Sequence, residues 1–237
     1  MRRTSNLFFL LLFIPFLSIA QNRSNDSSYY NWYDDLVGVE NTGLYVGYEY
    51  KDQYRITEEH HKFFQSHDFL TGSLTYNGQI FYDQELKYNV FDDDLIIKLK
   101  NKSGETVMQL INDNLDGFSI NDHHFYKFQN VEEEGSYTSG FYEILKMNDH
   151  FKLIKKHSKR KIKKLDKKVI YFEYKNRKPQ YFIIQNSVSY ELRSKKDFTG
   201  IFPEYKNEIK EFISKSKSER EIEYKRLSDL IFQLRTK

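Results

Sequence analysis

Apolar and polar residues alternate along most of the chain between residues 70 and 192, and turn sequences interrupt the pattern at short intervals. Leu74 and Tyr76 alternate with polar neighbours up to Asn77-Gly78, a pair typical of a two-residue hairpin turn. Further apolar runs follow over 80–82, 86–90, 95–99, 106–111, 118–120, 123–128, 141–145, 151–154, 169–174, 181–184 and 188–192. Short strands at this spacing predict an antiparallel meander with one face of the sheet buried.

After about residue 200 the apolar residues recur at the spacing of a helix. Phe202, Ile209 and Phe212 mark a first helix. Ser218 and Glu221 have the form of a capping box, which predicts the start of a second helix there. We therefore expect an α+β fold that is mostly β: an antiparallel β-meander, open or partly closed like a barrel, followed by two C-terminal amphipathic helices packed on it.

The N-terminal residues have the pattern of an export signal. Arg2 and Arg3 precede an apolar run over 7–19, and Ser18-Ile19-Ala20 supply small residues before a cleavage point. An uncleaved anchor is the alternative, but the run is shorter than the ~20 residues needed to cross a bilayer. The sequence predicts a signal peptide over 1–20 and no membrane span after its removal.

The mature chain, from Gln21, is expected to form one globular domain. A flexible leader with an aromatic cluster would occupy 21–44, the meander 45–193 and the helical pair 194–237. The full chain has 237 residues, with 39 Tyr and Phe but 3 Pro, 10 Gly and no Cys. This aromatic content excludes a disordered chain, and a mean hydropathy of -0.74 excludes a polytopic membrane protein. Without Cys there is no disulfide, which suits an exported bacterial protein with an ordinary core.

The formal net charge of +3 conceals a division of the chain. Residues 21–150 contain 10 Lys and Arg against 23 Asp and Glu, whereas residues 151–237 contain 25 against 11. The two parts therefore carry -13 and +14. Such an asymmetry points to an interaction surface in the basic part.

The basic charge is densest over residues 152–168, where ten of seventeen residues are Lys or Arg. This density attracts anions, so we expect binding to an acidic protein surface or to anionic lipid, including lipopolysaccharide. Export leaves little opportunity to bind nucleic acid. Two alternatives stay open: a solvated hairpin, or pairing with the chain's own acidic half. The candidate residues are Lys152, Lys155, Lys156, Lys159, Arg160, Lys161, Lys163 and Lys164.

A second candidate surface is the aromatic cluster of the leader, formed by Tyr29, Tyr30, Trp32 and Tyr33. These rings could stack on sugars or on a peptide partner. Packing across the sheet is the alternative and is favoured, because large aromatic side chains bury well.

The sequence contains no motif that predicts catalysis, a metal or a cofactor. The pairs His60-His61 and His123-His124 lack the spacing of a metal-binding helix and are expected at the polar surface. Asp92-Asp93-Asp94 lacks the pattern of a calcium loop and is expected to be a solvated turn. No nucleophile motif or Gly-rich phosphate loop is present.

Three stretches carry a resemblance to known proteins: GSLTYNGQIFYDQELKYNVFDDDLIIKL (72–99), GFYEILKMNDHFKLI (140–154) and YELRSKKDFTGIFPEYKNEIKEFI (190–213). The chain resembles uncharacterised exported β-rich proteins of Gram-negative bacteria, which end similarly in a strand, a Lys-rich turn and a helix. The resemblance implies an envelope location and a β-rich fold, and transfers no catalytic residue.

These observations favour a non-enzymatic envelope protein that acts as a binding or structural module. The alternative is an envelope hydrolase that uses carboxylates of the acidic N-terminal half. The two differ in geometry, since glycoside hydrolysis needs two carboxylates about 5 to 10 Å apart across a cleft.

Overall fold

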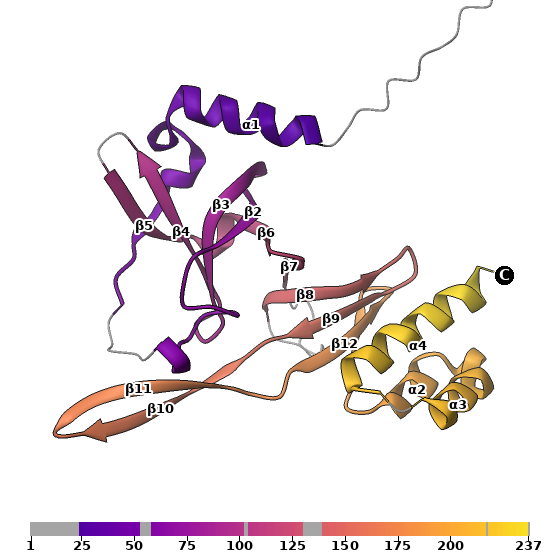
Figure 1. The fold of residues 1–237 in the computed structure, drawn as a ribbon. Helices are drawn as coiled ribbons and strands as arrows, with labels where there is room; N and C mark the ends of the chain where they lie inside the picture. The colour runs from indigo at the N-terminus through magenta and orange to yellow at the C-terminus, as the bar shows by residue number, and fades with distance from the viewer. Residues whose placement is uncertain (1–23, 53–57, 102–103, 130–138, 217, 237) are drawn as a thin grey trace, which may run out of the picture.

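The computed structural model describes residues 24–52, 58–101, 104–129, 139–216 and 218–236 (Figure 1). The predicted signal peptide of residues 1–20 lies outside this part of the chain. An eleven-stranded antiparallel sheet dominates the described residues, and its two end strands do not pair with each other. Helices follow the sheet at the C-terminus. The prediction of an α+β, mostly β fold with an antiparallel sheet is confirmed, and the sheet is open.

Most neighbouring strands of the sheet are consecutive in the chain, but three neighbouring pairs are not. Their spatial order is β1 (Gly47–Glu49), β5 (Gly104–Leu110), β4 (Asp94–Asn101), β3 (Gln79–Asn89), β2 (Leu70–Tyr76), β6 (Leu115–Ile120), β7 (His123–Phe128), β8 (Gly140–Met147), β9 (Lys152–Lys156), β12 (Gln180–Gln185) and β13 (Val188–Glu191). The β2–β3 turn is Asn77-Gly78, and both residues have positive φ, as the predicted hairpin requires.

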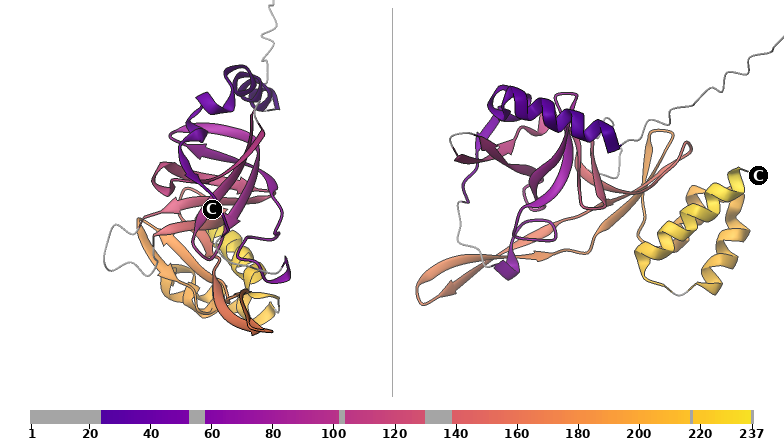
Figure 2. Two further views of the ribbon diagram at one scale, coloured as in Figure 1. Left: turned by 90° about the vertical axis from the view of Figure 1, so that its left-hand side faces the viewer. Right: turned by 45° about the horizontal axis from the view of Figure 1, so that its top comes forward.

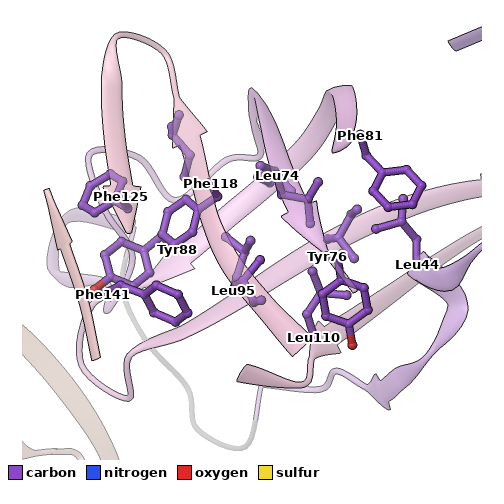
Figure 3. Close-up of a cluster of buried hydrophobic side chains, with 14 of the residues drawn as sticks. Leu44, Leu74, Tyr76, Phe81, Tyr88, Leu95, Leu110, Phe118, Phe125 and Phe141 are labelled. Carbon is purple, nitrogen blue, oxygen red and sulfur yellow. The ribbon is translucent and has the colours of Figure 1, made fainter. Parts of the chain in front are cut away.

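The first hydrophobic core lies against the strands from β2 to β8 (Figure 3). Tyr88, Phe118 and Phe125 form its aromatic centre, with ring centroids 4.8 to 5.1 Å apart. Phe141 joins them from β8, 5.3 Å from the Phe118 ring. Each such side chain contributes roughly 1.5–3 kcal/mol when fully buried, so this cluster fixes which face of the sheet points inward.

The second core joins the far end of the sheet to the C-terminal helices α2 (Phe198–Ile201), α3 (Lys206–Lys215) and α4 (Arg220–Arg235). The Phe151 ring lies 5.3 Å from Phe202, and Tyr181 packs edge-on against Tyr224 at 5.1 Å. The helices are thus docked on the sheet as predicted. Phe212, by contrast, is only partly buried.

The second long helix begins later than its sequence pattern predicts. α4 starts at Arg220, and the backbone N–H of Ser218 donates to Glu223 Oε1 at 3.3 Å. Glu221 instead accepts from Lys155 Nζ at 2.7 Å. The predicted capping box of Ser218 and Glu221 is therefore wrong, because a tertiary ion pair uses the Glu221 carboxylate.

A helix, α1 (Ser24–Val37), occupies much of the segment expected to be a flexible leader. It lies beside β3 (Figure 1). Asn31 Nδ2 donates to Asp83 Oδ2 at 2.8 Å, and the Tyr30 ring lies 5.8 Å from that of Tyr82. These contacts hold the helix against the sheet.

The strands β10 (Lys159–Asp166) and β11 (Val169–Asn176) form a separate two-stranded hairpin, here called the arm. The arm is inserted between β9 and β12, which pair directly with each other up to Lys156 and Gln180. It projects away from the sheet and from the C-terminal helices (Figures 1 and 2).

Candidate functional site

The arm concentrates positive charge on a thin, projecting element. Residues 159–176 contain eight Lys and Arg but only two acidic residues, Asp166 and Glu173, for a net charge of +6. Glu173 lies 3.9 Å from Lys164 Nζ and 3.7 Å from Lys175 Nζ. No carboxylate of the described residues is within 4 Å of the charged groups of Arg160, Lys163, Lys167 or Lys168. These four residues are all exposed.

The pairing register places lysines and apolar side chains together on one face of the arm. Lys163 is opposite Phe172, and Leu165 is opposite Ile170. Side chains directly opposite each other in an antiparallel pair share a face. Lys161 Nζ lies 4.1 Å from the centre of the Phe172 ring, within the range of a cation–π contact.

The tip of the arm is both apolar and basic. Leu165 is 71% exposed, and Val169 and Ile170 are each 49% exposed. Lys167 and Lys168 form the turn, with φ of 44° and 72°. Asn-Gly is the preferred pair at such positions, since left-handed backbone is unfavourable for lysine. The tip therefore keeps two cations at a position where stability alone would favour other residues.

The inner part of the predicted basic run has another role. Lys155 Nζ is 2.7 Å from Glu221 Oε2 and 3.4 Å from Glu143 Oε2, and Lys156 Nζ is 2.6 Å from Asp93 Oδ2. Asp93 and Glu143 belong to the acidic half of the chain, as one of the sequence alternatives proposed, whereas Glu221 belongs to the basic half. Lys152 lies 5.8 Å from the Phe128 ring. The structure thus divides the run: Arg160, Lys161, Lys163 and Lys164 belong to the arm, whereas Lys155 and Lys156 tie strands together.

Asp93 is not the solvated turn residue that the sequence predicts. Its Oδ1 accepts from the Tyr88 hydroxyl at 2.5 Å, and its Oδ2 accepts from the Phe141 N–H at 3.1 Å as well as from Lys156. Gly140 makes this approach possible, because its φ is +146° and a Cβ there would collide with Asp93 Oδ2. The Asp93 carboxylate therefore links β8 and β9 to the β3–β4 turn. Three consecutive Asp residues carry no signal that one of them is bound internally.

Glu143 bridges two imidazoles beneath the foot of the arm and is only 5% exposed. Its Oε1 is 2.6 Å from His123 Nδ1, and its Oε2 is 2.6 Å from His157 Nε2. Asn121 Nδ2 donates to Gln65 Oε1, which turns the Gln65 amide nitrogen toward His123 Nε2 at 2.9 Å. His123 is then the tautomer that donates from Nδ1 to Glu143.

The electrostatics of this group favour an ionised Glu143 carboxylate beside a neutral His157 imidazole. Burial acts to raise the pKa of Glu143, but hydrogen bonds from His157 and His123 and the charge of Lys155 outweigh it and hold the pKa at about 2. Burial also lowers the pKa of His157 below its ordinary value, although the hydrogen bond to Glu143 opposes this shift. His157 is therefore a neutral donor near pH 7.

A cavity of about 610 Å³ lies above this group, at the foot of the arm. The β9–β12 ladder stops at the pair Lys156–Gln180, and the β10–β11 ladder starts at Lys159–Asn176. The break contains two residues on one strand, 157–158, and three on the other, 177–179. Pro179 in the longer segment has no N–H to donate. The interrupted ladder leaves space that the segment 59–65 only partly fills.

The lining of the cavity combines cationic and apolar side chains with uncharged polar ones such as Gln65 and Asn176. Lys159, Lys175 and Arg177 provide positive charge, and Phe64 and Tyr174 provide aromatic walls. Glu59 is the one carboxylate among the described residues that line it.

Lys159 and His61 meet at one wall of the cavity. Lys159 Nζ donates to the backbone carbonyls of His61 and Phe63, each at 2.7 Å, and burial lowers the pKa of Lys159 to about 8. Burial and the charge of Lys159 lower the pKa of His61 to about 4. His61 was expected at the surface but is buried, and its Nδ1 accepts from the Phe63 N–H at 3.1 Å.

The aromatic cluster of the leader lies on α1, away from the cavity lining. Tyr29, Trp32 and Tyr33 are exposed, with Trp32 at 60%. Tyr30 is also partly exposed but contacts Tyr82 of β3. Packing against the sheet, the favoured alternative, therefore describes Tyr30 only.

Within the described part of the chain, no group of three or more His, Asp or Glu side chains is placed to hold a metal ion. None of the described helices is both long and apolar enough to cross a bilayer. The sequence matches no protein-family model, no curated protein and no solved structure.

Proposed function

We propose that this protein is an exported, non-enzymatic binding module of the bacterial envelope that attaches through its arm to an anionic lipid surface, including lipopolysaccharide. The observation that carries the proposal is the arm itself, which projects from the sheet with a net charge of +6 and an exposed apolar tip. The export signal that we predict over residues 1–20 would bring this element to where such surfaces occur.

The chemistry of the arm favours lipid over an acidic protein surface. Lysines near an anionic membrane each contribute about 1 kcal/mol. Leu165, Val169 and Ile170 can enter the boundary between headgroups and acyl chains, as the apolar faces of interfacial elements do. An acidic protein surface would satisfy the lysines but would leave these three side chains in contact with charge.

The hydrolase alternative has less support. Glu59 is the one carboxylate on the described lining of the cavity, and Glu143 is held beneath it by two imidazoles. An acid and a base of the glycosidase type need two carboxylates that face each other across the substrate. That arrangement is missing from the described lining.

Vesicle binding tests the proposal with two variants of equal charge. The arm variant is Lys163→Gln/Lys167→Gln/Lys168→Gln. The control, Lys196→Gln/Lys206→Gln/Lys210→Gln, removes three exposed lysines near the C-terminal helices. Cosedimentation with vesicles that contain anionic lipid would measure the affinity of the mature chain and of each variant.

We expect the arm variant to lose about 100-fold in affinity, from ~1 kcal/mol per lysine, and the control to change less than about threefold. Vesicles of zwitterionic lipid alone should bind the unmodified chain weakly. Equal losses in the two variants would show that general charge, not the arm, drives binding. No loss in the arm variant would overturn the proposal.

A further inference from the structure

We propose that the cavity at the foot of the arm is a binding site for a small phosphate monoester that carries an apolar or ring-shaped group. This site is separate from the lipid-binding role of the arm, because it is formed by the junction of the arm with the sheet and not by its tip. The proposal stands on four features of the cavity: its size, its cations, its fixed geometry and its apolar walls.

The size of the cavity fits a small molecule. Its volume of about 610 Å³ lies within the ~300–1,000 Å³ of typical small-molecule sites. The break in the ladder between Lys156–Gln180 and Lys159–Asn176 explains why the space exists. It is therefore built by the backbone and does not depend on one side-chain rotamer.

The cations on the wall are suited to a dianion. Arg177 has no carboxylate within 4 Å among the described residues, and Lys175 has only Glu173 at 3.7 Å. A guanidinium can donate two parallel hydrogen bonds to phosphate, and an ammonium adds a point charge. Lys159 is a third cation on this wall. Two of its three N–H groups donate to the carbonyls of His61 and Phe63, so one N–H is left to donate to a ligand.

The same contacts hold the wall in place before a ligand arrives. Lys159 is fixed by its two carbonyl bonds, and the Arg177 backbone N–H donates to the carbonyl of Ser158 at 2.9 Å. His157 is fixed by Glu143, and the Phe64 ring packs edge-on against it with centroids 5.0 Å apart. A preformed site loses less entropy on binding.

The remaining walls favour an organic group over free phosphate. Phe64 and Tyr174 line the cavity together with Val90 and Pro179. Burial of apolar area against these side chains would strengthen binding beyond the charge interaction. A phosphate attached to a ring or short carbon chain uses both kinds of wall, whereas inorganic phosphate uses only the cations.

Calorimetry with phenyl phosphate, inorganic phosphate and phenol as probes tests this site in the mature chain. We expect saturable binding of phenyl phosphate, weaker binding of inorganic phosphate and weakest binding of phenol. The site variant Lys175→Gln/Arg177→Gln should lower the affinity for phenyl phosphate by roughly 100-fold, because it removes about two charge-assisted hydrogen bonds. The control Lys163→Gln/Lys168→Gln removes equal charge nearer the tip and should change the affinity less than about threefold.

Amide chemical shifts should locate the bound phenyl phosphate near Phe64, His157 and Tyr174. Vesicles containing phosphatidic acid provide a second source of the same phosphate chemistry. Competition between these vesicles and phenyl phosphate would mean that the natural source is a lipid headgroup, and its absence would mean a soluble molecule. Both outcomes are consistent with a phosphate-binding site in the cavity.

Three results would overturn the proposal: no saturable binding at millimolar phenyl phosphate, an equal loss in both variants, or shifts confined to the tip. Because Lys175 and Arg177 reach solvent, folding of the site variant can be checked by circular dichroism. If the arm variant loses vesicle binding but still binds phenyl phosphate, the phosphate site is retained although the lipid proposal is tested separately. The two proposals can therefore be refuted independently of each other.

Discussion

The carboxylate of Glu143 offers a sharp test of the architecture at the foot of the arm. Replacing it by glutamine keeps the shape of the side chain but removes the charge and one acceptor oxygen. One imidazole N–H would keep its acceptor, whereas the other would face an amide N–H at the position now 2.6 Å away. Lys155 would keep Glu221 at 2.7 Å as its partner.

The cost follows from these contacts. A hydrogen bond to a charged group contributes about 1.5–3 kcal/mol, and one such bond is lost while the other is weakened. Breaking a buried ion pair can cost about 3–5 kcal/mol, but Lys155 retains a partner here. We therefore expect Glu143→Gln to lower the free energy of unfolding by about 2–4 kcal/mol, measured by urea titration at neutral pH. The control Glu211→Gln, which breaks an exposed ion pair on α3, should leave the unfolding curve nearly unchanged.

The pH dependence supplies an independent check. The pKa of Glu143 is about 2 in the folded protein, below its ordinary value of 4.5. The unfolded chain therefore binds a proton before the folded one does, so the stabilisation by Glu143 is present above about pH 4.5 and is lost as the pH falls toward 2. Wild type should lose more stability over this window than Glu143→Gln. A cost below about 1 kcal/mol, or identical pH profiles, would refute the account of this network.

Two further predictions concern the core and the export signal. Phe202→Ala should lower the free energy of unfolding by about 3–5 kcal/mol, because its ring is fully buried against Phe151. Phe212→Ala should lower it clearly less, because the Phe212 ring is only partly buried. Equal losses of stability in thermal melts of the two variants would contradict this packing. Mass spectrometry of protein from its native host should find the mature N-terminus at Gln21, and mature protein that retains Met1 would contradict the predicted cleavage.

Local patterns in the sequence were sufficient to predict the framework of the fold. The Asn77-Gly78 turn, the period-two strands and the helical spacing of Phe202 and Ile209 are each patterns of residues close in the chain. Helix α1 was not predicted, because its contacts with β3 come from distant residues such as Asp83.

The site was predicted only in part, for a related reason. Charge density marks the basic run, but the chain order does not show that a break at His157-Ser158 separates Lys155 and Lys156 from the arm. The cavity combines residues from 59–65 with residues from 155–179, and the cation at Lys159 is set by carbonyls about a hundred positions earlier. Contacts between residues so far apart in the chain produce no periodic pattern in a single sequence.

The insertion of the arm between two paired strands also bears on how the chain folds. Direct pairing of β9 with β12 would close a long loop if the arm were unstructured. Each doubling of loop length costs about 0.6 kcal/mol, so starting from the two-residue turn at Lys167-Lys168 saves roughly 2 kcal/mol of closure entropy. Contacts between near neighbours in the chain also form fastest. Pairing of β10 with β11 can therefore start at the tip of the arm and proceed toward its foot. It would then bring β12, and the helices that follow it, onto the sheet.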